Sequence, residues 1–300
     1  TGGDPMKYLY YPGCSLEGSA REYDLSTRAF MAAVGAELVE IEDWTCCGAS
    51  AAEATNRHLA LALPARNLAL AEKMGGTREI LVPCSACYLN LKAVEEKVKR
   101  DAALLDRINA ILAVEGLHFA GRIHVRHLLE VIVRDIGPDL IAKKTVRSLE
   151  GISIAAYYGC QCLRPYPVFD DPEAPQSMTP ILEAAGAAVH HWDMGGKCCG
   201  ASHMNTKMAV GMELVRSILL RARGADAVVT VCPMCQMNLE AYQGKISKLG
   251  GENLAVTVLY LPQLLGLALG LSEQEVRLDL NLAVTAGFQQ KLRHSEPVPA

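Results

Sequence analysis

The sequence has few of the features that are typical of membrane-spanning, nucleic-acid-binding or nucleotide-binding proteins. Its longest apolar runs, such as Tyr260–Leu271, are too short and too often interrupted by glycine or proline to span a bilayer. The net charge of -4 and the absence of a lysine and arginine run give no indication of nucleic-acid binding. Glycine-rich stretches such as Gly195-Gly196 do not open a dinucleotide-binding unit. We therefore expect no membrane span, no nucleic-acid partner and no flavin or nucleotide held by this chain.

A secretory signal is also missing before Met6, although the chain contains 11 cysteines. Cysteines in a protein that is not exported stay reduced, so they favour metal ligation over structural disulfides. The odd count leaves one thiol outside any scheme of full pairing. These observations predict a cytoplasmic protein that uses its thiols as ligands.

Ten of the cysteines form two sets of five that follow the same order, about 150 residues apart. Their flanks agree as well: YYPGC matches AYYGC, WTCCGAS matches GKCCGAS, and LVPCSACYLNL matches TVCPMCQMNLE. The first set is Cys14, Cys46, Cys47, Cys84 and Cys87, and the second is Cys160, Cys198, Cys199, Cys232 and Cys235. The chain is therefore a tandem duplication, and each set is predicted to form one metal or cluster site.

Each half also repeats one order of strands and helices. The predicted strands are Tyr8–Tyr11, Glu37–Ile41 and Ile80–Val82, then Ile152–Tyr158, Ala187–Trp192 and Ala227–Val231. The predicted helices are about Glu22–Val34 and Asn56–Met74, then Ser177–Ala185 and Thr206–Arg223, with one long charged helix about Leu91–Val114. This alternation predicts an α/β fold of two pseudo-symmetric repeats, each a small, mostly parallel sheet flanked by helices. The cysteines follow strand ends, and such loops gather at one edge of a parallel sheet.

A break in the repeated pattern indicates where the first half ends and the second begins. We expect a first domain at 1–137, a linker at 138–151, a second domain at 152–293 and a loose tail at 294–300. The linker is predicted because a Gly-Pro and the pair Lys143-Lys144 interrupt the repeated pattern.

The arrangement of thiols limits the metal chemistry. Adjacent cysteines, as in Cys46-Cys47 and Cys198-Cys199, chelate a single tetrahedral ion awkwardly and suit neighbouring irons of a cluster better. Five thiols per set exceed the four that one zinc ion or a cubane cluster uses. Iron–sulfur clusters in both halves are favoured. Structural zinc in both halves, metal-free redox dithiols, and one cluster with one zinc remain alternatives.

The order Cys, Cys-Cys-Gly, Cys-x-x-Cys, found twice, resembles the cysteine-rich CCG domain, and the pair resembles the B-type subunit of heterodisulfide reductase. The segment YYGCQCLRP around Cys160 is similar to that subunit's second motif, and the resemblance covers Met6 to about Leu271. The spacing from Cys199 to Cys232 is slightly shorter than in the family, which one fewer helical turn would absorb.

The resemblance implies that each set of five cysteines holds one noncubane [4Fe-4S] cluster. It also implies reductive cleavage of a disulfide, of the CoM-S-S-CoB type or related, between two one-electron centres. The implied partners are a ferredoxin-like subunit of the C type and a flavin subunit of the A type, because this chain lacks a ferredoxin-type cysteine run. The alternative is an electron-relay subunit of a succinate, glycerol-3-phosphate or lactate dehydrogenase-type complex.

Cationic and aromatic residues beside the motifs supply further candidates. Binding of an anionic substrate is expected to involve Arg164, Lys197, Lys207 and Arg21, each of which could equally be a solvated surface charge. Candidate proton donors to the thiolate released from a cleaved disulfide are His190, His191 and His203. Of these, His203 lies just past a Cys-Cys-Gly loop. Trp44 and Trp192 are expected to shield a cluster, and Cys162 to be a spare thiol.

Overall fold

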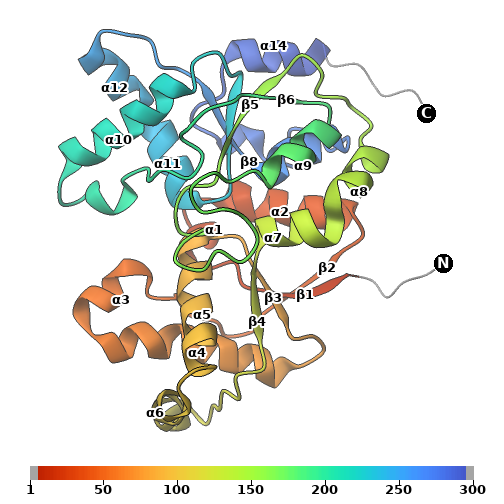
Figure 1. Cartoon of the computed structure of the whole chain (residues 1–300). Helices are drawn as coiled ribbons and strands as arrows, with labels where there is room; N and C mark the ends of the chain where they lie inside the picture. Colours follow the sequence, from red (N-terminus) through yellow and green to blue (C-terminus); the bar gives the residue numbers. More distant parts are fainter. Residues whose placement is uncertain (1–5, 295–300) are drawn as a thin grey trace.

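The computed structural model describes residues 6–294, and its two halves lie one above the other in Figure 1, each on a four-stranded parallel sheet. The sheet orders are β2-β1-β3-β4 and β6-β5-β7-β8, so the topology is repeated strand for strand. The strands are β1 Lys7–Tyr10, β2 Glu37–Glu40, β3 Glu79–Val82, β4 His124–His127, β5 Ser153–Tyr157, β6 Ala188–Val189, β7 Ala227–Thr230 and β8 Thr257–Tyr260. The predicted α/β fold with two pseudo-symmetric repeats is confirmed.

Helices follow the strands in both halves, as the crossovers between parallel strands require. In the first half they are α1 Cys14–Glu17, α2 Arg21–Ala33, α3 Ala49–Thr55, α4 Arg57–Met74, α5 Ser85–Val98, α6 Ala102–Leu112, the 3-10 turn η1 Ala113–Glu115, α7 Leu128–Val131, the π-turn η2 Ile132–Ile136 and α8 Gly137–Lys144. In the second half they are α9 Met178–Ala184, the 3-10 turn η3 Ala201–His203, α10 Met208–Arg221, α11 Pro233–Ala241, α12 Gln243–Gly250, α13 Leu261–Ala268, the 3-10 turn η4 Leu278–Leu280 and α14 Ala286–His294.

Two predicted elements differ from the structure. The single helix expected over Leu91–Val114 is two helices, because the carboxylate of Asp101 accepts a hydrogen bond from Leu104 N (2.8 Å) and starts α6 anew. The strand expected over Ala187–Trp192 is only Ala188–Val189. Beyond it the indole of Trp192 donates to the carbonyl of Ala156, which folds this segment back onto β5.

The segment predicted as a linker, 138–151, contains most of a packed helix instead. Pro138 occupies the first turn of α8, where its missing N–H costs nothing, so Gly137-Pro138 begins a helix rather than breaking the chain. Helix α8 packs on α9 of the second half. The proposed domain limits stay a prediction. Of the tail at 294–300, only His294, the last residue of α14, lies within the described residues.

The two halves share the larger of two hydrophobic clusters, and the smaller one lies within the second half. Helix α2 of the first half packs on α13 of the second, just as α8 packs on α9. The rings of Tyr23 on α2 and Tyr260 at the end of β8 stack across this contact, 4.0 Å apart and 4° from parallel. Both side chains are almost fully buried, so the contact is part of the core. The sheet edges that carry the cysteines are thereby held against each other.

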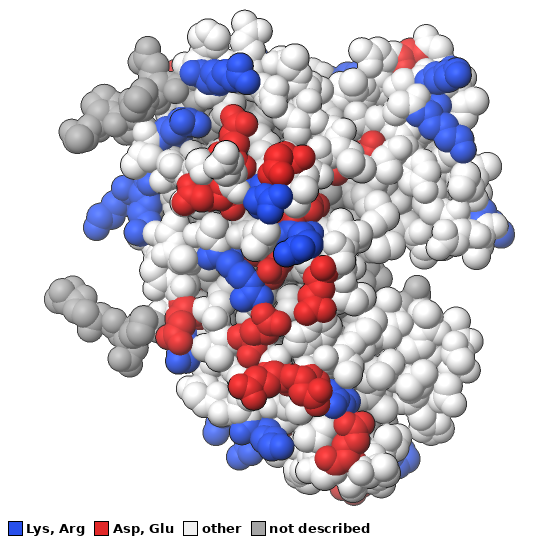
Figure 2. Space-filling view, turned by 180° about the vertical axis from the view of Figure 1, so that it is seen from behind, with Lys and Arg blue, Asp and Glu red and all other residues white. Residues whose placement is uncertain are grey.

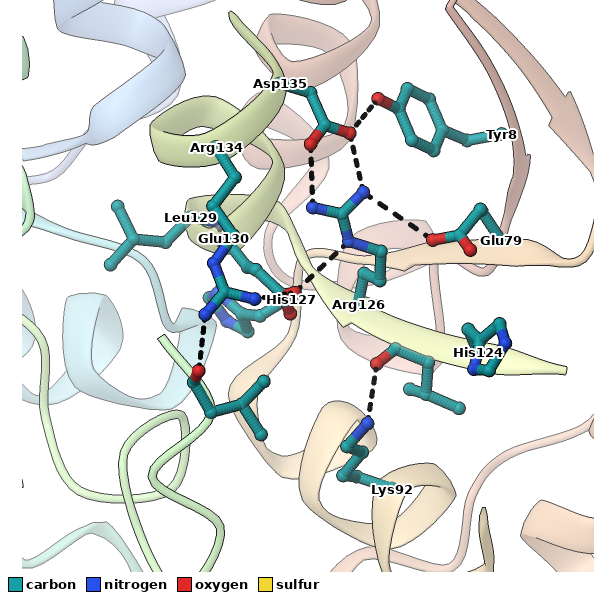
Figure 3. Close-up of polar contacts among 12 residues, drawn as sticks. Tyr8, Glu79, Lys92, His124, Arg126, His127, Leu129, Glu130, Arg134 and Asp135 are labelled. Carbon is teal, nitrogen blue, oxygen red and sulfur yellow. Dashed lines mark hydrogen bonds and ion pairs between the residues drawn. The ribbon is translucent and has the colours of Figure 1, made fainter. Parts of the chain in front are cut away.

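Strand β4 ends between an ionic network and this core (Figure 3). On one side the guanidinium of Arg126 donates two hydrogen bonds to Asp135, at 2.6 and 2.9 Å, and a third to Glu130. Tyr8 donates to Asp135 as well. On the other side lies His127, which is fully buried. Successive side chains of a strand point to opposite faces. Arg126 therefore lies in the ionic network while its neighbour His127 lies in the core.

Charges on the face shown in Figure 2 form a mixed band. Acidic and basic side chains alternate along it, and neither sign forms a continuous patch. Within residues 6–294, no helix combines the length and apolar character that crossing a bilayer requires.

Candidate functional site

Loops at the carboxyl ends of the strands bring each set of cysteines together. In the first half, the Sγ atoms of Cys14 and Cys46 lie 3.6 Å apart, and those of Cys47 and Cys87 lie 3.3 Å apart. Cys84 is the residue before α5, and after Cys47 it is the thiol that raises the pKa of Cys87. Residues more than 70 positions apart thus share one site, as the sheet topology predicts.

The second set repeats these pairs. Interaction with Cys198 raises the pKa of Cys160, interactions with Cys199 and then Cys232 raise that of Cys235, and interaction with Cys235 lowers that of Cys232. All five thiol residues line a pocket of about 140 Å³ whose other wall includes Ala49, Ser85 and Ala86 of the first half. The second site therefore opens toward the first.

Two glycines leave room for sulfur beside the strands. Gly13 has φ of 74°, and a Cβ added there would lie 2.8 Å from the Sγ of Cys87. Gly159, its counterpart, has φ of 71°, and its Cβ would lie 3.0 Å from the Sγ of Cys235. A side chain at either position would displace a thiol, so this glycine is required by the site itself.

The glycine of each Cys-Cys-Gly loop donates its N–H to the first cysteine of the doublet. Gly48 N–H donates to the Sγ of Cys46 at 3.4 Å, and Gly200 N–H donates to the Sγ of Cys198 at 3.3 Å. The pKa of Cys198 is lowered to about 6, first by its hydrogen bond with Cys160, then by Gly200 and the positive charges of His203 and Arg164, against burial, which raises it. Hydrogen bonds with Cys46 and then Cys87 lower the pKa of Cys47. Each half thus favours a thiolate, the ionisation state that binds metal.

An asparagine three residues after each Cys-x-x-Cys pair holds the Cys-Cys loop, and the sequence analysis does not single it out. The amide of Asn90 donates to the carbonyls of Cys47 (3.2 Å) and Ala49 (3.1 Å), and that of Asn238 donates to the carbonyl of Cys199 at 3.1 Å. Both residues lie in the matching flanks LVPCSACYLNL and TVCPMCQMNLE, so the duplication itself is the signal that could have found them.

Replacing Asn90 with leucine is expected to weaken metal retention by the first site about 10- to 100-fold, since groups that orient ligands typically contribute that much. The matched change Asn238→Leu is expected to weaken only the second site. Metal release to a chelator, followed by absorbance, measures both. Equal loss from both sites in either variant would contradict the assignment.

A tyrosine and a tryptophan cover each set. The Tyr11 hydroxyl donates to the carbonyl of Thr45 at 2.7 Å, and its ring packs edge-on against Trp44. In the second half the Tyr157 hydroxyl donates to the carbonyl of Lys197 at 2.7 Å, and its ring meets Trp192. Burial and then the nearby thiols raise the pKa of both tyrosines, so both stay neutral. The tryptophans therefore support the tyrosines that lie next to the thiols.

The structure separates the cationic candidates. Arg164 lies near Cys198 and is held by the carbonyls of Pro172 and Gly196 and by Glu173. Lys197 precedes Cys198 in the chain and lies 3.9 Å from Glu173. Lys207 and Arg21 are exposed at the starts of α10 and α2. Within residues 6–294, neither has a resolved interaction with the thiols.

Of the three histidines, only His203 approaches the thiols. It is exposed on η3, and its positive charge acts on Cys198. His190 hydrogen-bonds through Nε2 to the carbonyl of Arg221 (3.0 Å), and with His191 it lines a different pocket beside Trp192.

Cys162 is buried beneath the second set. Its thiol donates to the carbonyl of Tyr158 at 3.1 Å, and burial raises its pKa. This arrangement suits a spare thiol, and that role stays a prediction.

The donors in each site are all thiols, which suits iron–sulfur or zinc chemistry. In the described part of the chain, however, no group of three His, Cys, Asp or Glu side chains is arranged around a single metal ion. The thiols lie instead as linked pairs. The space left beside Gly13 and Gly159, and the backbone N–H donors of Gly48 and Gly200, are compatible with a larger, polynuclear group.

Comparison with known proteins identifies the domain. The cysteine-rich CCG domain matches residues 8–92 and 154–240, once in each half. The chain is 35% identical over 280 residues to the 8-methylmenaquinol:fumarate reductase membrane anchor subunit of Wolinella succinogenes, covering 92% of this chain and 96% of that one. It is 27% identical over 293 residues to the B-type subunit of the ferredoxin/F(420)H(2)-dependent CoB-CoM heterodisulfide reductase of Methanosarcina acetivorans, covering 95% and 97%.

A solved structure agrees in fold. A hypothetical protein from Helicobacter pylori superposes with a TM-score of 0.77 at 17% identity, covering 95% of this chain and 53% of that one. This chain thus spans about half of that structure, and the likeness concerns the fold alone. The domain matches and the relatives together place the chain in the family of proteins with two cysteine-rich CCG domains, which includes the B-type subunit of heterodisulfide reductase.

Proposed function

We propose that this chain is the iron–sulfur subunit of an oxidoreductase complex and that it reductively cleaves a disulfide. The observation that carries the proposal is the pocket of about 140 Å³ between the halves, which exposes the second set of thiols to a wall of the first half. A bond that needs two electrons is best served by two one-electron centres, and the chain has two equivalent sets of ligands.

The ten cysteines of the two sets would hold the clusters, one noncubane [4Fe-4S] cluster in each half. When bound, such clusters would supply one electron each, so that R–S–S–R′ with two electrons and two protons gives RSH and R′SH. The residues of the chain bind and orient the disulfide in the pocket. His203 is placed to give a proton to the thiolate that leaves near Cys198. Arg164, already fixed by two carbonyls, would face the anionic groups of the substrate.

A second candidate is an electron relay, and the 35% identity to a quinol:fumarate reductase anchor subunit favours it. In that role the two centres would pass electrons between a quinol and a flavoprotein, and no disulfide would be cleaved. Both candidates use the same ten cysteines.

Both candidates also need partners. For the disulfide reductase we propose a ferredoxin-like subunit as electron donor, a flavin subunit behind it, and a cytoplasmic location. The relay would instead dock a dehydrogenase or reductase flavoprotein.

The deciding experiment reduces the anaerobically purified chain with a low-potential dye and then adds an acceptor. Rapid reoxidation of the centres by a CoM-S-S-CoB-type disulfide, but not by a menaquinone analogue, supports disulfide cleavage. The opposite pattern supports the relay. In a parallel sample, NADH without other proteins is expected to reduce nothing, because electrons must arrive from another subunit.

Metal analysis tests the cofactor separately. We expect about eight iron atoms per chain and little zinc, four for each cluster. Anaerobic elemental analysis measures this directly. Four irons and one zinc would leave one redox centre and one structural site, and would rule out the two-centre reaction.

A further inference from the structure

The edge strand of the second sheet ends earlier than its counterpart in the first. Strand β2 has four residues, and β6 has two. After β2 the backbone stays on the sheet, because the N–H of Ile41 donates to the carbonyl of Tyr10 at 3.0 Å. The equivalent carbonyl in the second half, that of Ala156, accepts instead from the indole of Trp192 at 3.0 Å. A side chain takes the place of the backbone here, so the chain after β6 leaves the sheet edge.

A pocket of about 350 Å³ lies where β6 ends. Its walls are the chain at 189–193, the loop at 173–176 before α9, and the segment 195–197 that leads to Cys198. Within residues 6–294, Tyr158 is the one lining residue that it has in common with the thiol pocket. Its volume lies in the range of small-molecule sites, about 300–1,000 Å³. The pocket is therefore a separate site that lies next to the second set of cysteines.

The charged side chains of this pocket already have partners. Glu173 contacts Arg164 at 2.9 Å and lies 3.9 Å from Lys197. Asp193 lies 3.9 Å from Arg221. A charged ligand would have to compete with these ion pairs, whereas an uncharged ligand would leave them intact. The charge balance therefore favours an uncharged ligand.

The apolar walls of the pocket are flat. They include the indole of Trp192, the ring of Pro175 and the ring of Tyr158. The indole is held at the sheet edge and packs edge-on against Tyr157, with 6.1 Å between the ring centres. Ring surfaces that are fixed in this way favour a planar aromatic ligand.

Two imidazoles supply hydrogen-bond acceptors. Nε2 of His190 lies 3.0 Å from the carbonyl of Arg221, which can only accept, so Nε2 carries the proton and Nδ1 is left as an acceptor. His191 also lines the pocket and has no hydrogen-bond or ion-pair partner in the described part of the chain. The strand register makes Val39 and Glu40 their equivalents in the first half. The imidazole pair thus belongs to the second half alone.

We propose that this pocket binds a quinol, an uncharged planar ring whose hydroxyl groups donate hydrogen bonds to His190 and His191. The proposal rests on the electron relay described above as the second candidate function, and it gives that relay a place where the quinol binds. Oxidation of a quinol to a quinone releases two electrons and two protons. Each imidazole can accept one proton near neutral pH, and each of the two proposed centres can accept one electron.

The test is anaerobic isothermal titration calorimetry of the purified chain with menadiol. Saturable one-to-one binding is expected. The dimethyl ether of menadiol keeps the planar ring but has no hydroxyl donor. It is expected to bind at least about tenfold more weakly, because it leaves both imidazole acceptors unpaired.

Three variants separate hydrogen bonding from shape. His191→Leu removes an acceptor at an exposed position and is expected to weaken menadiol binding about tenfold, with a smaller effect on the ether. Ala174→Trp places a large ring in the pocket from an exposed loop residue and is expected to abolish binding of both. His118→Leu changes an exposed histidine of the first half, and this matched control is expected to bind menadiol as the unchanged chain does.

Absence of saturable binding, or equal affinity for menadiol and its ether, overturns the proposal. Unchanged affinity in His191→Leu overturns it as well, and this variant decides if Ala174→Trp does not fold. The readout is binding rather than turnover, so it is independent of the relay itself. A chain that binds menadiol here but exchanges no electrons with quinones would contradict the relay and leave this site standing. A chain whose centres are reoxidised by a quinone, but whose affinity ignores these variants, would support the relay and remove this site.

Discussion

Replacing Cys198 with alanine is expected to empty the second site of metal and to reduce disulfide turnover at least about 100-fold. Loss of a group that only orients a ligand costs up to about 100-fold, and loss of the ligand itself costs more. Cys198 is exposed, so the change removes a thiol from the pocket without opening a cavity in the core. The first site draws its five ligands from residues 14–87 and is expected to keep about four irons. Iron analysis and absorbance of the purified variant measure the result.

Cys162→Ala is the matched control. It also removes a thiol near the second site, but one that donates to the carbonyl of Tyr158 and does not line the pocket. We expect unchanged iron content. Iron loss in this control would make Cys162 a ligand, and iron loss from both sites in Cys198→Ala would show that the sites do not fill independently.

Truncating Tyr260 to alanine is expected to lower the free energy of unfolding by about 3–5 kcal/mol, as large-to-small changes of buried aromatic residues do. The ring stacks on Tyr23 at 4.0 Å across the contact between the halves. The total free energy of unfolding of a domain is only about 5–15 kcal/mol, so this loss is a large share of it. Urea unfolding, followed by tryptophan fluorescence in each half, gives the midpoint. We expect Trp44 and Trp192 to report the same lowered midpoint, because Tyr260 lies in the hydrophobic cluster that residues of both halves build.

Tyr260→Phe is the control, since it keeps the stacked ring and removes only the hydroxyl. Its expected cost is much smaller than that of Tyr260→Ala, because the stacked ring and its burial are kept. Two separate transitions in Tyr260→Ala, with Trp44 unaffected, would show that the halves are stable without each other.

The thiol sites are predictable from the sequence because their signal is doubled. Five cysteines in matched context, in loops that follow predicted strands, indicate which thiols gather and at which edge of the sheet they do so. Asn90 and Asn238 carry the same doubled signal, but an asparagine in a helix has many uses and only the contact with the Cys-Cys loop reveals this one. The hydrogen bond from Ser85 to the Val231 carbonyl of the other half could not be predicted from the repeat, because the counterpart of Ser85 is Pro233.

The division of the helix expected over Leu91–Val114 and the start of a helix inside the predicted linker have a common physical cause. A residue that starts a helix resembles one that interrupts or merely continues a pattern. Gly137-Pro138 suggests a break in the chain, yet proline in the first turn starts α8. Asp101 resembles one more charge along a polar helix, yet its side chain caps a new one. How α8 and α13 pack depends on residues from the opposite half, which no local pattern contains.

The exchange of helices between the halves has the form of a two-fold dimer whose subunits have been fused. Helix α2 packs on α13 and α8 packs on α9, so in each half a helix that follows the fourth strand packs on a helix that follows the first strand of the other half, as in an isologous interface. A single half made on its own would expose both of these apolar surfaces. It would bury them only by pairing with another copy of itself, and that pair would be symmetric. The fused chain is free of that constraint, and its two cysteine sites already differ at equivalent positions, with Ser85 against Pro233 and Leu16 against Cys162.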